Sequence, residues 1–132
     1  MRVLCKANSG QALSAEYFEI GYTSSTEFDL EQGKEYIVYA IILTKGLLSY
    51  LIVGEASLPG WYPARLFGLT RKDLPNDWFF EYLSEEEGFV VDALWGYEEL
   101  VHKEDHFDGL SNMNKPDIEV FLQRKKEIDN VS

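Results

Sequence analysis

The fold is decided by one stretch of sequence, EYIVYAIILTKGLLSYLIV, which spans residues 35–53. Residues 35–43 and 47–53 are rich in β-branched, aromatic and aliphatic side chains, and the short segment Thr44-Lys45-Gly46 separates them. Two such runs around a short loop that contains glycine are typical of an antiparallel hairpin. Both arms are almost continuously apolar, so we expect this hairpin to lie in the middle of a sheet that is covered on both faces.

Working outward from the hairpin, short apolar and aromatic runs between turn signals predict further strands. These strands are expected at residues 2–7, 17–22, 64–69, 78–83 and 89–94, with a helix start as the alternative for the last of them. Residues 58–63 contain Pro59 and Pro63, and two prolines so close together predict a corner without a regular strand ladder.

The C-terminal segment has the pattern of a helix over residues 115–128. Asn114 precedes it as a capping residue, and Pro116 stands in its first turn. The apolar side chains that share one face of this helix are Ile118, Phe121, Leu122 and Ile128. Strands followed by a helix predict an α+β fold for a single domain, residues 1–132: a bent antiparallel β-sheet or small, partly open barrel of about six strands with one C-terminal helix.

The composition is that of a globular domain, with 132 residues, 45% hydrophobic and 27% charged. Cys5 is the one cysteine, so no internal disulfide can form, which favours a reducing compartment. The first residues lack the long apolar run of a signal peptide, and no segment is apolar enough to span a membrane. The sequence therefore predicts a cytoplasmic protein without a membrane partner.

The charge of the chain is concentrated in one segment. The whole chain has a net charge of −11, which excludes the basic footprint that nucleic-acid binding requires. Residues 73–108 hold twelve carboxylates and one base, Lys103, so this segment alone has a net charge of −11. A negative surface of this kind favours either solubility alone or docking to a basic partner protein.

Aromatic residues are interleaved with these carboxylates, as in interfaces that combine apolar anchors with a charged rim. We therefore identify a candidate partner-binding set. Its members are Asp73, Asp77, Glu85, Glu86, Glu87, Glu98, Glu99 and the aromatic anchor Trp78.

Catalytic and metal-binding patterns are weak. His102 and His106 have the i, i+4 spacing of a helical metal clamp, but they lack the flanking motif, so we interpret them as surface residues. Cys5 is interpreted as a small buried side chain rather than a nucleophile. Glu85, Glu86 and Glu87 are interpreted as solvated rather than as a glycosidase pair. The chain has no phosphate-binding glycine loop and no nucleophile elbow, so the sequence predicts no catalytic residue, no metal and no cofactor.

Two segments carry a resemblance to a known class of proteins. They are residues 58–67 (LPGWYPARLF), followed by 74–78 (LPNDW), and residues 106–110 (HFDGL). Together they resemble segments of small acidic bacterial immunity proteins of polymorphic or contact-dependent toxin systems, over roughly residues 34–125. The resemblance implies stoichiometric inhibition of a toxin domain without catalysis, and it carries no particular binding residue over to this chain.

These observations favour a non-catalytic acidic binding protein, of the immunity type, that occludes a basic toxin domain such as a nuclease. Two alternatives stay open. One is a small ligand-binding or enzymatic β-barrel, with a pocket lined by Tyr36, Tyr39, Trp61 and Trp78. The other is a structural or adaptor subunit of a larger assembly, which a large exposed apolar patch would favour. The sequence does not specify an oligomeric state.

Overall fold

The computed structural model describes residues 1–83 and 91–132, and it confirms an α+β fold with antiparallel sheets and a C-terminal helix. A five-stranded sheet has the order β5-β4-β3-β8-β7. A three-stranded sheet has the order β2-β1-β6. The described residues thus contain eight strands rather than about six, and neither sheet closes into a barrel.

The five-stranded sheet is built on the expected hairpin. β3 (Ala40–Thr44) and β4 (Leu47–Val53) pair in register, with Thr44 opposite Leu47. Lys45 and Gly46 both have positive φ, the conformation of the tight turn whose twist suits a hairpin. β3 is the middle strand of the sheet, which confirms the central position predicted for the hairpin.

The remaining strands of this sheet are β5 (Pro59–Pro63), β7 (Phe79–Tyr82) and β8 (Ala93–Gly96). The prediction that Pro59 and Pro63 would prevent a strand was wrong, because β5 pairs with β4 along its full length. A strand at the edge of a sheet needs hydrogen bonds on one side only, so it tolerates proline on the other. Residues 89 and 90 of the strand predicted at 89–94 lie outside the described residues.

The three-stranded sheet consists of β1 (Arg2–Cys5), β2 (Glu35–Ile37) and β6 (Phe67–Arg71). The run predicted as one strand at residues 35–43 is therefore divided between the two sheets. Val38, between β2 and β3, is completely buried and donates its backbone N–H to the carbonyl of Met1. The strand predicted to start at Ala64 begins instead at Phe67, after a 3-10 turn at Ala64–Leu66.

A strand was also predicted at residues 17–22, and this was wrong. The chain forms the short helix α1 (Ala15–Phe18), and a second 3-10 turn precedes it at Gly10–Ala12. Tyr17 reaches the core from this helix, and its hydroxyl donates a hydrogen bond to the carbonyl of Leu48 at 3.4 Å. Tertiary packing of the aromatic ring overrides the strand preference of this segment.

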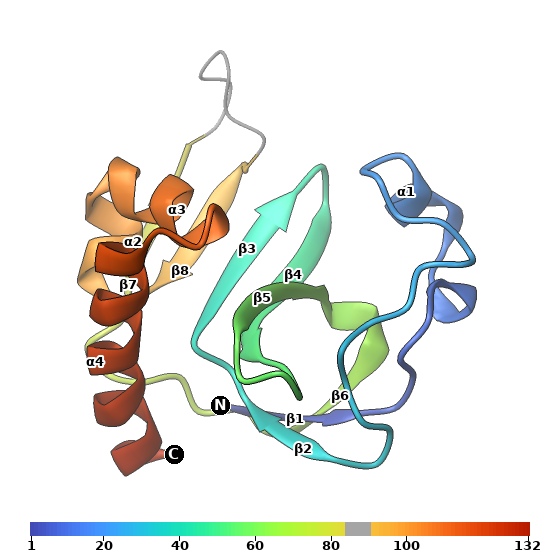
Figure 1. Cartoon of the computed structure of the whole chain (residues 1–132), viewed down its shortest axis with the longest axis horizontal. Coiled ribbons are helices and arrows are strands. Elements are labelled where there is room, and N and C mark those ends of the chain that lie inside the picture. The colour runs from blue at the N-terminus through green and yellow to red at the C-terminus, as the bar shows by residue number, and fades with distance from the viewer. Residues whose placement is uncertain (84–90) are drawn as a thin grey trace.

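Three helices cover one face of the five-stranded sheet, as Figure 1 shows. They are α2 (Glu98–His102), α3 (Glu104–Ser111) and α4 (Lys115–Val131), where the sequence predicted α4 alone. Phe121 of α4 is fully buried in a cluster with Leu51 and Leu100. Leu122 was expected on the same face, but it is 46% exposed, because it lies one residue, or about 100°, further round the helix.

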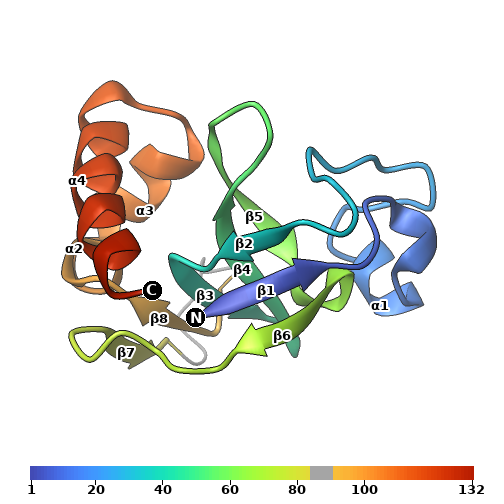
Figure 2. The ribbon, with the colours of Figure 1, turned by 90° about the horizontal axis from the view of Figure 1, so that it is seen from below.

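The three-stranded sheet packs on the opposite face. Its residues Val3 and Tyr36 share a second cluster with Tyr50 and Ile52 of β4, whose neighbours Leu51 and Ser49 face the helices. Figure 2 shows β1, β2 and β6 together on one side of the molecule, with both chain ends close to them. Arg2 joins these ends, because its guanidinium donates to the carbonyl of Ser132 at 2.6 Å.

Candidate functional site

A groove runs between the β6–β7 connection and α4. The connection, residues 72–78, forms one wall, and the last turns of α4 form the other. The groove has a volume of about 780 Å³. Its carboxylates are Asp73 and Asp77 on the connection and Glu127 on the helix. The fold therefore brings acidic side chains together here from two segments that are fifty residues apart.

A smaller hollow of about 270 Å³ continues the groove toward α2. The groove and the hollow adjoin each other, because Asn76 and Asp77 line both of them. The hollow is also lined by Trp78, Glu98 and Arg124. We call the two spaces together the acidic groove, and we define its carboxylates as Asp73, Asp77, Glu98 and Glu127.

Within residues 1–83 and 91–132, three of these four carboxylates have only long or solvent-exposed ion pairs. Asp73 is 84% exposed and lies 3.8 Å from Arg71. Glu98 lies 3.8 Å from Arg124, and Glu127 lies 3.1 Å from the same guanidinium while remaining half-exposed. Exposed pairs of this kind are weak, so these carboxylates can exchange their partners for the cations of another molecule.

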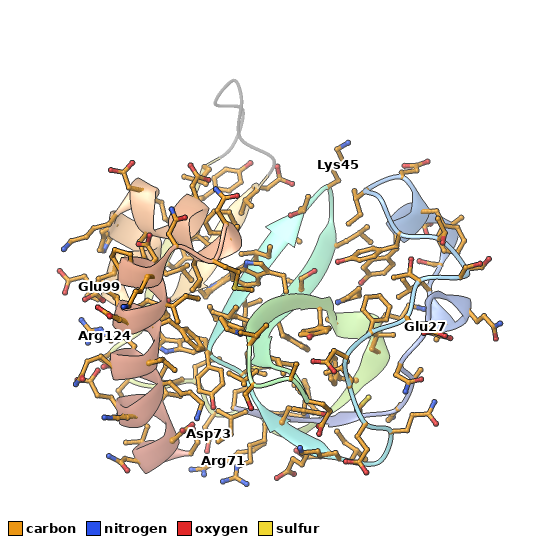
Figure 3. The ribbon with its side chains drawn as sticks, in the orientation of Figure 1. Glu27, Lys45, Arg71, Asp73, Glu99 and Arg124 are labelled. Atoms are coloured by element: carbon orange, nitrogen blue, oxygen red, sulfur yellow. The ribbon has the colours of Figure 1, made fainter. Side chains whose placement is uncertain are left out.

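Glu99 differs from the other predicted carboxylates. It accepts two hydrogen bonds from Arg124, to Nε at 2.7 Å and to Nη2 at 3.1 Å, and it is only 22% exposed. These hydrogen bonds lower the pKa of Glu99 and raise the pKa of Arg124. Figure 3 labels both residues beside α4, far from Glu27 at the other end of the molecule. Glu99 therefore holds α2 against α4.

Trp78 is half-buried rather than a free anchor. Its ring packs against both large hydrophobic clusters, and its Nε1 is buried with no hydrogen-bond acceptor among the described residues. Its edge contributes to the smaller hollow. Trp78 thus fixes the position of the β6–β7 connection, and only part of the ring is open to a partner.

The structure places five of the predicted residues around one region: Asp73, Asp77, Trp78, Glu98 and Glu99. The other three, Glu85, Glu86 and Glu87, lie outside the described residues. Sequence reasoning missed Glu127, because it falls outside the acidic segment 73–108. Its position one residue before the buried Ile128 on the predicted helix was the available signal.

The aromatic residues proposed to line an internal pocket point in different directions. Tyr36 packs into the cluster beneath the three-stranded sheet, and its hydroxyl donates to Glu55 at 2.6 Å. Tyr39 packs against the helices, and its hydroxyl donates to Asp129 at 2.7 Å. Trp61 stacks near Phe107 on the helix side. Tyr36 is therefore separated from Tyr39 and Trp61 by the sheet.

His102 and His106 lie on different helices, because Lys103 has an extended backbone conformation that separates α2 from α3. His102 is partly exposed, as expected, and its Nδ1 lies 3.9 Å from Glu81. The prediction that His106 is a surface residue was wrong, since it is only 4% exposed. Among the residues that the structure describes, no group of three His, Cys, Asp or Glu side chains is arranged to hold a metal ion.

Both ring nitrogens of His106 are hydrogen bonded. Nδ1 lies 3.0 Å from the carboxylate of Asp117, and Nε2 lies 2.7 Å from the hydroxyl of Tyr97. A carboxylate only accepts, so Nδ1 donates to Asp117; in the neutral ring, Nε2 then accepts the hydrogen bond from Tyr97. Burial raises the pKa of the Tyr97 phenol, with the nearby carboxylates of Glu99 and Asp117 adding to the effect. This network joins Tyr97, the residue that precedes α2, to α3 and α4.

Cys5 is buried, as expected from its strand position. Burial raises the pKa of its thiol, and the Sγ lies 3.3 Å from the carbonyl of Ala7, to which it donates. A raised pKa keeps the thiol protonated, which opposes nucleophilic reactivity.

Comparison of the chain with protein-family models, with curated proteins and with solved structures found no match. Within the described residues, none of the helices combines the length and the apolar composition needed to cross a membrane.

Proposed function

We propose that this protein is a non-catalytic binding protein of the immunity type, which inhibits a basic toxin domain, such as a nuclease, by occluding it. The observation that carries the proposal is the acidic groove, where exposed carboxylates from the β6–β7 connection, α2 and α4 line two adjoining hollows. A charged, concave surface on a chain with a net charge of −11 favours a partner of opposite charge.

The mechanism is steric and electrostatic. Asp73, Asp77, Glu98 and Glu127 pair with the Lys and Arg side chains that the toxin uses to hold phosphates. Exposed apolar side chains at the rim, Leu74 and Val131, contribute the contact area that excludes water from these pairs. The inhibitor then covers the substrate-binding face of the toxin without any chemical step.

An adaptor subunit is the second candidate function, because one strand of the protein exposes several aromatic side chains. Phe79, Phe80 and Tyr82 of β7 are all exposed. Apolar surface of this kind is typical of an interaction site. The ligand-binding alternative has less support, because the aromatic side chains proposed for its pocket are divided between two faces of the sheet.

The test is protection of growth by co-expression of the full chain with the domain encoded by the neighbouring reading frame. We expect that domain to be basic and to stop growth when it is expressed alone. We also expect the purified pair to bind with a rate that falls steeply as salt is added. A domain that is harmless, or whose toxicity the chain does not relieve, would contradict the proposal.

The decisive variants carry matched charge changes. The groove variant combines Asp73→Asn, Asp77→Asn, Glu98→Gln and Glu127→Gln. The control variant combines Glu16→Gln, Glu19→Gln, Glu27→Gln and Glu31→Gln, four exposed carboxylates away from the groove. Both variants remove four negative charges. Loss of protection in the groove variant alone supports the proposed site, and equal behaviour of the two variants contradicts it.

A further inference from the structure

β7 is the last strand of the five-stranded sheet, and its outer edge has no pairing strand within residues 1–83 and 91–132. In Figure 2 it lies at the periphery of the molecule, beyond β8. Phe80 is 53% exposed and Tyr82 is 66% exposed. An exposed edge that is rich in aromatic residues is a template for another strand.

The hydrogen-bond pattern identifies the groups on this edge. Leu83 donates its N–H to the carbonyl of Asp92 on the β8 side at 2.7 Å. In an antiparallel pair the backbone groups of successive residues point alternately to the two sides, so Glu81 and Phe79 also face β8. Phe80 and Tyr82 therefore direct their N–H and C=O groups outward, away from the sheet.

The opposite edge of the same sheet is protected. Just before β5, Leu58 accepts a hydrogen bond at its carbonyl from the N–H of Gly54, which follows β4. By the same alternation, the backbone groups of Gly60 and Tyr62 face β4. The backbone groups of Pro59, Trp61 and Pro63 face outward. The two prolines have no N–H to offer another strand. β7, with the sequence Phe-Phe-Glu-Tyr, has neither proline nor lysine, the residues that commonly prevent edge pairing.

The negative charge of Glu81 determines which kind of strand can pair with the outer edge of β7. In the antiparallel self-pairing that uses all four outward groups, Phe80 would lie opposite Tyr82 of a second copy, and Glu81 would oppose Glu81. Like charges directly opposite each other are destabilising. Asp77 and Glu98, which line the adjacent end of the acidic groove together with Phe79, add to the repulsion. A strand with Lys or Arg opposite Glu81 removes this penalty.

We propose that β7 accepts an extended segment of the basic partner as a sixth strand of the sheet. Apolar side chains of that segment pack on Phe80 and Tyr82, and its Lys or Arg side chains face Glu81. The identity of the occupant rests on the proposed function, and the edge pairing itself rests on the geometry of β7. The partner would thus be held by backbone hydrogen bonds beside the acidic groove.

The test uses the full chain, labelled with ¹⁵N, and a capped seven-residue peptide in which Lys and Val alternate. We expect saturating peptide to slow hydrogen exchange of the Phe80 and Tyr82 amides by about tenfold or more, because a paired N–H exchanges only when the strand opens. The Glu81 amide, which already faces β8, should change little. The same peptide with Glu in place of Lys should give no protection.

Tyr82→Pro removes an outward N–H without removing a hydrogen bond to β8, so it should abolish protection at Phe80. Tyr82→Phe is the matched control and should behave as the wild type. Glu81→Lys should reverse the preference, binding the Glu peptide and not the Lys peptide. This charge exchange keeps the test decisive if the proline variant does not fold.

Three results would overturn the inference: no protection at Phe80 and Tyr82, protection that survives Tyr82→Pro, or a dimer in sedimentation equilibrium that Tyr82→Pro dissociates. These results are distinct from failure of the proposed function. The groove variant should still show peptide protection even where it no longer protects growth. Conversely, a Tyr82→Pro chain that inhibits the toxin domain as well as the wild type would remove β7 from the interface and leave the groove in place.

Discussion

The carboxylate of Asp117, from α4, occupies the space that a Cβ atom would need at Gly109 of α3. This position therefore suits glycine, which has no Cβ. The same carboxylate accepts the hydrogen bond from His106. Within residues 106–110, His106 therefore forms a hydrogen bond with Asp117, and Gly109 leaves space for its carboxylate. This contact joins two helices on the outer side of the sheet.

Gly109→Ala should destabilise the protein by about 1–3 kcal/mol, although alanine normally stabilises a helix relative to glycine. The reason is that the methyl group forces Asp117 away from His106. Urea denaturation measures the change. In the double variant Gly109→Ala with Asp117→Ala, the methyl group has room. The loss of unfolding free energy should therefore be smaller than the sum of the losses in the two single variants. Full additivity would contradict this account.

Phe121→Ala should lower the free energy of unfolding by about 3–5 kcal/mol, because the ring is completely buried and stacks edge-on against Tyr39. Leu122→Ala is the matched control on the neighbouring position of α4. It should cost less than about 1 kcal/mol, since the side chain is exposed. Equal costs in denaturant unfolding would show that α4 presents a different face to the sheet.

Glu99 should make stability dependent on pH. Its pKa is lowered from an ordinary value of 4.5 by hydrogen bonds from Arg124, so its contribution is present above that value and is lost as the pH falls through the lowered pKa. Glu99→Gln should cost about 1.5–3 kcal/mol at pH 7 and much less in strong acid. Glu98→Gln, whose pair with Arg124 is longer and more exposed, should change stability by less than about 0.5 kcal/mol at either pH.

Neutralising the acidic segment should affect association more than folding. Glu85→Gln, Glu86→Gln and Glu87→Gln together should slow binding to a basic partner and flatten its salt dependence, because long-range fields set association rates. Stopped-flow mixing at low and high salt measures both. Unchanged rates, with increased aggregation, would indicate that these charges serve solubility only.

A chelator should leave the melting temperature unchanged, and added zinc should not raise it. His102 and His106 lie on separate helices, and both nitrogens of His106 are already hydrogen bonded. A fall of several degrees with chelator, reversed by zinc, would instead reveal a metal site. Differential scanning calorimetry on the full chain provides the measurement.

The sequence by itself determined the elements whose signals are local. The β3–β4 hairpin follows from two apolar runs around Lys45 and Gly46, which accept the positive φ values of the turn. The helix at Lys115–Val131 follows from Pro116 in its first turn and from the apolar spacing after it. Asn114 takes the N-cap position as predicted, but its side chain makes no capping hydrogen bond. The concentration of negative charge in residues 73–108 is likewise a property of composition, independent of how the chain folds.

Only the tertiary structure decided which segments lie side by side, and this determined the site. Glu99 is held by two hydrogen bonds from Arg124, while Asp73 is 84% exposed and has only a long contact with Arg71, a distinction that depends on the packing of α2 against α4 and not on the residue type. Pro59 is accepted in β5, and Tyr17 is buried from a helix, because an edge position and a core contact outweigh local preference. Local patterns act within one segment, whereas burial, edge position and charge pairing depend on contacts between segments that are distant in the sequence.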